Sequence, residues 1–166
     1  MTTPELLLYG PAWLSLSAWA ASECAVSAGR ERLARGAWSA GALALLAHTL
    51  LAFHLRHAWS HAAALRHTAL QTESVTGLDW SGGLYVNYAF VALWIVDAAV
   101  WWTAPLRHRG RSPLRRRLIR GAFLFMFANG AIVFARGPVR ALGALAICLV
   151  LWSWYRAPGA DPQPHV

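Results

Sequence analysis

Charged side chains are scarce in this sequence. Only 13% of the 166 residues are Asp, Glu, Lys or Arg, whereas a soluble domain usually carries about 25%. Hydrophobic residues make up 57% of the chain, and ten of its residues are tryptophan. This composition excludes an ordinary soluble domain and predicts a chain solvated by lipid.

Lysine is absent altogether, so all fifteen basic residues are arginine and the formal net charge is +8. In a soluble protein such a charge would suggest nucleic acid as the partner. Here the arginines fall between long apolar segments, where basic residues report membrane topology. We therefore expect a lipid bilayer as the partner and no nucleic acid.

Motifs that carry chemistry are also missing. The sequence has no glycine-rich nucleotide loop, no Gly-x-Ser-x-Gly elbow and no His-Glu-x-x-His pair. Its two cysteines, Cys24 and Cys148, lie inside apolar segments and form no Cys-x-x-Cys pair, so we interpret them as small hydrophobic residues. An enzyme acting as an isolated chain is not favoured.

Five apolar segments have the roughly 17 to 25 residues that a membrane-spanning helix needs. They are residues 6–28, 37–59, 83–103, 118–135 and 139–155. Because backbone polar groups in lipid must be satisfied internally, helices are expected. The sequence thus predicts an all-α fold, a polytopic transmembrane bundle of about five spanning helices in one domain (1–157), with a disordered tail (158–166).

Two alternatives to five crossings stay open. The last two segments are joined by a very short connection and would also fit a re-entrant hairpin. The first segment would fit a cleaved signal peptide, although residues 1–5 lack the positive charge typical of one.

Arginines cluster in alternate connections. One side of the predicted membrane receives Arg30, Arg32, Arg35, Arg107, Arg109, Arg111, Arg115, Arg116, Arg117, Arg120 and Arg156, and the other receives Arg56, Arg66, Arg136 and Arg140. We expect the protein in the cell inner membrane. The positive-inside rule then places its N-terminus outside and its C-terminus in the cytoplasm. Anionic lipid headgroups at that face are the predicted partners of Arg107, Arg109, Arg111, Arg115, Arg116 and Arg117.

Histidines crowd the end of the second apolar segment. If its helix continued to Ser74, it would be roughly 57 Å long and would project beyond the membrane. On such a helix His54, His57 and His61 share one face, and the i, i+4 spacing of His57 and His61 suits a metal ion. Glu73 and Asp79 are candidate additional ligands, and zinc, copper or iron is the favoured class of metal.

Haem is less favoured as the cofactor. A haem held by two histidines between membrane helices takes one from each helix, and the other four apolar segments contain no histidine. The alternatives to a metal site are a set of solvated or hydrogen-bonded imidazoles at a helix end, and a proton-relay or pH-sensing role for these histidines.

Polar residues inside the apolar segments form a second candidate set: Glu23, His48, Asn87, Asp97 and Asn129. An ionisable residue within a membrane is costly and marks a functional hypothesis. One role for these residues is to conduct protons or bind a solute. The alternative is that they only hold helices together by hydrogen bonds. In the latter case Arg107 or Arg120 is the expected partner of Asp97.

Three functions follow from these features. The first is a small integral membrane protein that binds a metal or redox cofactor at the histidines near the outer face, as a subunit of a larger membrane complex. The second is a small transporter or proton-conducting protein that uses Glu23, Asp97 and His48. The third is an accessory membrane subunit without a site of its own.

Overall fold

The computed structural model describes residues 3–135 and 137–156, and the predicted disordered tail and Arg136 lie outside these ranges. The described residues are helical almost throughout, which confirms the all-α prediction. The elements are α1 (Thr3–Ser27), α2 (Glu31–His57), α3 (His61–Thr76), α4 (Gly83–Thr103), α5 (Pro105–Arg109), α6 (Pro113–Ala128), the π-helical turn η1 (Asn129–Val133) and α7 (Pro138–Arg156).

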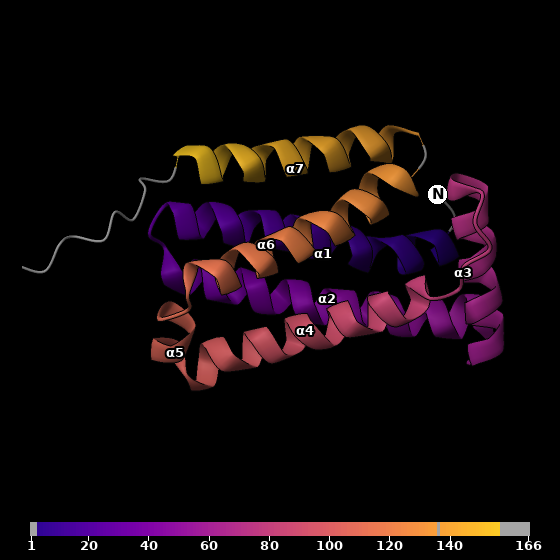
Figure 1. The fold of residues 1–166 in the computed structure, drawn as a ribbon, viewed down its shortest axis with the longest axis horizontal. Helices are drawn as coiled ribbons and strands as arrows, with labels where there is room; N and C mark the ends of the chain where they lie inside the picture. Colours follow the sequence, from indigo (N-terminus) through magenta and orange to yellow (C-terminus); the bar gives the residue numbers. More distant parts are fainter. Residues whose placement is uncertain (1–2, 136, 157–166) are drawn as a thin grey trace, which may run out of the picture.

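The long helices α1, α2, α4, α6 and α7 run side by side along the long axis of the molecule (Figure 1). Helix α3 lies across one end of this bundle, and the short α5 lies at the opposite end. We call these the α3 end and the α5 end. The turn between α1 and α2, the link from α4 to α6 and the last turn of α7 all lie at the α5 end, so the arginine-rich connections meet there.

The second helix is shorter than the sequence predicts. It ends at His57, where Ala58 and Trp59 adopt positive φ angles of 45° and 62°, and α3 then begins at His61. The Ser60 side chain caps α3 by accepting a hydrogen bond from the Ala63 amide at 3.2 Å. The prediction of one helix continuing to Ser74 is therefore wrong, because left-handed residues and a serine cap break it.

Two helices, α2 and α4, are long and apolar enough to cross a membrane by length and composition, among the residues that the structure describes. This is weak support for membrane association, because a core helix of a soluble protein meets the same criteria. The prediction of five spans is not confirmed.

Aromatic side chains form the core. Phe123 of α6 packs against Trp38 of α2 and Trp94 of α4, with ring centroids 4.5 Å and 4.8 Å away. One turn later, Phe127 stacks on Trp19 of α1 at 4.8 Å. Large rings of this kind bury 150–250 Å² each, so α6 is held between α1, α2 and α4 mainly by its phenylalanines.

Glycine allows two close approaches between helices. A Cβ atom at Gly41 of α2 would lie 2.5 Å from the ring of Trp94. At Gly143 of α7, a Cβ atom would lie 2.7 Å from the backbone oxygen of Ala131 in η1. Both positions need a residue without a side chain, as expected where helices pack closely.

Candidate functional site

A cavity of about 380 Å³ opens at the α5 end and is lined by three carboxylates: Glu23 of α1, Glu31 of α2 and Asp97 of α4. We call it the carboxylate cavity. Trp38 and Trp101 contribute apolar surface, and Arg109, Arg111, Arg116 and Arg120 contribute charge. Two of the predicted polar residues, Glu23 and Asp97, thus line one site.

Asp97 is 4% exposed and is paired with Arg111, whose side chain is 7% exposed. Arg111 Nη2 lies 2.6 Å from Oδ1, and Nη1 donates to Oδ2 at 3.2 Å. His108 Nε2 lies 3.6 Å from the same Oδ2. The prediction of Arg107 or Arg120 as the partner of Asp97 is wrong. Helix α5 ends at Arg109, and the chain after it places Arg111 next to Asp97.

Glu23 is held by groups from two other helices. Trp154 of α7 donates its Nε1 hydrogen to Glu23 Oε2 at 2.6 Å, and Nη2 of Arg120 on α6 lies 3.2 Å from the same oxygen. The Arg120 guanidinium also lies over the Trp154 ring, 4.8 Å from its centroid. This arrangement joins α1, α6 and α7 through one carboxylate.

Glu31 closes the outer rim of the cavity. Arg109 Nε donates to Glu31 Oε1 at 3.0 Å, and its Nη2 is paired with Oε2. The Glu31 carboxylate raises the pKa of the Arg109 guanidinium above its ordinary value. Trp101 also donates to Glu31 Oε1, at 3.5 Å, and its ring stacks flat on His108 with centroids 4.2 Å apart.

Hydrogen-bond donors exceed acceptors around this cavity. Trp38 Nε1 and Arg111 Nε are buried and have no hydrogen-bond partner among the described residues. Arg116 is exposed and forms no ion pair within the same residues. The two buried groups have almost no accessible surface, so the donors that a ligand in the cavity could reach are those of Arg116.

The three histidines predicted to bind metal have separate partners. His54 Nδ1 accepts a hydrogen bond from Trp59 Nε1 at 3.3 Å. His61 lies between two tyrosines of α4, with its Nε2 3.4 Å from Tyr85 Oη and its Nδ1 3.3 Å from Tyr88 Oη.

The nearest imidazole contact of His57 is with His67 of α3, at a centroid distance of 5.2 Å. Glu73 and Asp79, the candidate additional ligands, are exposed. Within residues 3–135 and 137–156, no three His, Cys, Asp or Glu side chains are grouped as a metal site would require. Metal binding at His54, His57 and His61 stays a prediction, without the continuous helix on which it was based.

The other polar residues that the sequence places inside apolar segments lie away from the carboxylate cavity. His48 Nδ1 is 2.8 Å from the carbonyl oxygen of Leu8 and so joins α2 to α1. Asn129, the first residue of η1, donates to the carbonyl of Phe125 in α6 at 2.8 Å, and Asn87 is exposed. The Leu8 contact gives His48 a role in helix packing.

The arginines predicted to bind lipid headgroups fall into two groups. Arg109 and Arg111 are paired with Glu31 and Asp97, as described above. The others are exposed and form no ion pair among the described residues: Arg107, Arg115, Arg116 and Arg117. Headgroup binding stays a prediction for the set, and the exposed four are the members whose charge is available for it.

No protein-family model matches the chain, and no significant match was found among curated proteins or solved structures.

Proposed function

We propose that the protein is an integral membrane protein in which all five long helices cross the bilayer. The distribution of side chains supports this. Ser15, Ser22, Glu23, Asp97 and Ser153 are buried, whereas large apolar side chains stand exposed on the long helices. Among the latter are Leu14, Leu43, Leu118, Leu142 and Leu145. Extended exposed apolar surface is unfavourable in water and normal in lipid.

Helix length is consistent with five crossings. Helices α1, α2, α4 and α7 have 25, 27, 21 and 19 residues, and roughly 17 residues are enough to span the hydrocarbon core. Helix α6 gains length from η1, which continues it by five residues. The α5 end, with its arginines, then faces the cytoplasm.

Cysteine labelling tests this topology. In a Cys24→Ser, Cys148→Ser background, Leu78→Cys at the α3 end should react with a membrane-impermeant maleimide in intact cells. Gly110→Cys at the α5 end should react only after the membrane is opened. Labelling of both variants, or of Gly110→Cys alone, in intact cells contradicts the proposed orientation.

Within this membrane protein, we propose that the carboxylate cavity binds a small anionic or zwitterionic solute, as a carrier would. The observation that carries the proposal is that two buried carboxylates, Glu23 and Asp97, meet in one cavity that is also lined by Arg116, an exposed arginine without an ion pair among the described residues. Convergent polar groups in a cavity of this size, with aromatic walls, are typical of small-molecule sites.

A second candidate function rests on the same ion pairs. Since Glu23 joins α1 to α6 and α7, the charged groups would act only as interhelical tethers of an accessory subunit. The two functions differ in whether the cavity takes up a solute.

Tryptophan fluorescence separates the two functions. Trp38 and Trp101 line the cavity, so the purified protein in detergent should show a saturable change on titration with succinate, glutamate or glycine, and vesicles containing it should take up the same labelled solute. Arg116→Gln removes a guanidinium that lines the cavity and should weaken binding about three- to tenfold, while Arg117→Gln, at an exposed neighbouring position that does not line the cavity, should not. No saturable change with any of the three solutes contradicts solute binding and supports the accessory function.

A further inference from the structure

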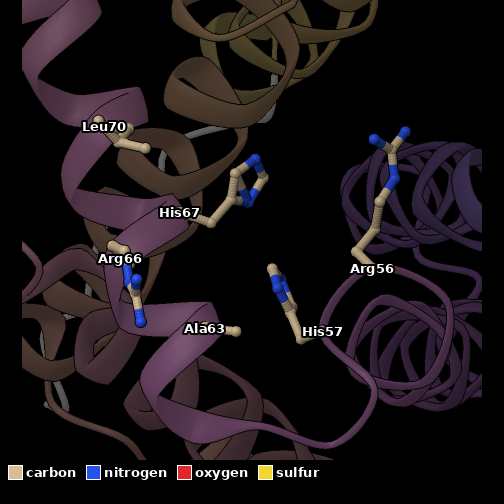
Figure 2. A pocket seen from close by; sticks show the side chains of 6 residues that line it. All are labelled: Arg56, His57, Ala63, Arg66, His67 and Leu70. Atoms are coloured by element: carbon tan, nitrogen blue, oxygen red, sulfur yellow. The ribbon is translucent and has the colours of Figure 1, made fainter.

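A second cavity, of about 490 Å³, lies at the α3 end between the end of α2 and the first turns of α3 (Figure 2). Arg56 and His57 line it from α2, and Ala63, Arg66, His67 and Leu70 line it from α3. The imidazoles of His57 and His67 point toward each other across this space, with centroids 5.2 Å apart. The break at Ala58 and Trp59 turns the chain so that α3 lies across the end of the bundle, and the cavity lies between α3 and the end of α2.

The charge of this cavity is of one sign. No carboxylate lines it, and neither arginine forms an ion pair within the described part of the chain. Arg56 only donates a hydrogen bond from Nη2 to Tyr9 Oη at 3.2 Å. Two guanidinium groups and two imidazoles therefore line an opening of about 490 Å³, and no carboxylate of residues 3–135 or 137–156 lines it with them.

We propose that this cavity binds a phosphate-bearing anion, as a monoester or a diester. Guanidinium groups match the oxygens of phosphate geometrically and form charge-assisted hydrogen bonds with them. The imidazoles of His57 and His67, which lie next to each other in the wall of the same opening, supply further N–H donors. Leu70, which is 60% exposed at the rim, provides apolar surface for the organic part of an ester.

The source of the phosphate is either a membrane lipid headgroup or a soluble phosphate ester. The site lies at the opposite end of the bundle from the carboxylate cavity, so it stands independently of the solute site proposed above. It also differs from the predicted metal site, since only His57 is common to both.

The test uses the full-length protein in detergent, with native mass spectrometry for lipids and calorimetry for inorganic phosphate. Phosphatidylglycerol is the lipid probe, and diacylglycerol, which lacks the phosphate, is the matched lipid control. We expect phosphatidylglycerol or inorganic phosphate to bind, and diacylglycerol to bind at least about tenfold more weakly than phosphatidylglycerol.

Two charge-matched variants locate the site. Arg56→Gln with Arg66→Gln should reduce binding of the phosphate probe by about tenfold or more. Arg30→Gln with Arg32→Gln removes the same charge from exposed positions at the α5 end and should leave binding within about twofold. His67→Gln, at an exposed position, should weaken binding about threefold and serves if the double variant does not fold.

Each outcome has a definite meaning. Binding of phosphatidylglycerol that inorganic phosphate does not displace identifies a lipid headgroup as the source, and binding of inorganic phosphate identifies a soluble ester. Equal binding of diacylglycerol and phosphatidylglycerol overturns the proposal. Absence of binding to either phosphate probe, or an equal loss in the two double variants, also overturns it.

Discussion

Trp154 Nε1 donates a 2.6 Å hydrogen bond to Glu23 Oε2 across 131 residues of sequence. This contact joins the last turn of α7 to the last turns of α1, next to the ion pair that Arg120 makes with the same oxygen. The beginning and the end of the described helical bundle are thereby connected at one buried carboxylate.

Replacing Trp154 by phenylalanine should destabilise the bundle by about 1–2 kcal/mol, because an aromatic side chain is kept while a hydrogen bond to a charged acceptor is lost. Thermal unfolding in detergent measures the change. Trp152→Phe is the control, since Trp152 is 53% exposed. Its ring contacts the guanidinium of Arg156 and stacks on no other aromatic ring of the described residues. Equal shifts for the two variants would show that the Glu23 contact contributes nothing.

Asp97→Asn should destabilise the protein by about 3–5 kcal/mol, because it leaves the buried Arg111 guanidinium without its counter-ion. Adding Arg111→Gln to this variant removes the uncompensated charge and should recover part of the loss. Unfolding of both single variants and the double variant gives the coupling energy. Additive effects would contradict a direct interaction between Asp97 and Arg111.

Gly41→Ala should lower stability by about 1–3 kcal/mol, because the new methyl group meets the Trp94 ring and the packed core must shift. Gly36→Ala, one and a half turns earlier in α2, meets nothing within 4 Å and should raise stability by about 0.5–1 kcal/mol through helix propensity. Unfolding midpoints in detergent compare them. A loss of similar size at both positions would argue against the close approach of α2 and α4.

Ala58→Gly should stabilise the protein by about 0.5–1 kcal/mol, since Ala58 has a positive φ of 45° and a left-handed residue with a Cβ atom is strained. Ala69→Gly, in the middle of α3, should lower stability by a similar amount because glycine weakens a helix interior. The two shifts should therefore have opposite signs. A destabilising Ala58→Gly would mean that α2 and α3 are continuous after all.

Much of the fold follows from the periodic and apolar character of the sequence. The third segment was expected at residues 83–103, and α4 has these bounds. The break after His57 was missed because neither glycine nor proline marks it. The local signal for a new helix is Ser60, a favourable N-cap residue. It caps α3 directly after Ala58 and Trp59, which lie in the left-handed region.

The sequence predicts the two acidic residues of the candidate site, Glu23 and Asp97, but it does not predict which side chains bind them. Glu23 and Asp97 are conspicuous because charges in apolar segments are rare. Their partners were harder to find, since Arg111 is one of several arginines in a connection whose path depends on the short helix α5. Trp154 gave even less indication, because tryptophans near helix ends are expected at a membrane interface whether or not they hold a carboxylate.

The position of Glu23 in the chain has a consequence for biosynthesis under the proposed topology. Translation proceeds from the N-terminus, so α1 leaves the ribosome long before Arg120 and Trp154 exist. An unpartnered acid within a membrane helix costs on the order of 2–3 kcal/mol at insertion. The first helix would therefore remain at the translocon, or near the aqueous boundary, until the last helix arrives to complete its pairing, and assembly of this bundle would be finished only with its final segment.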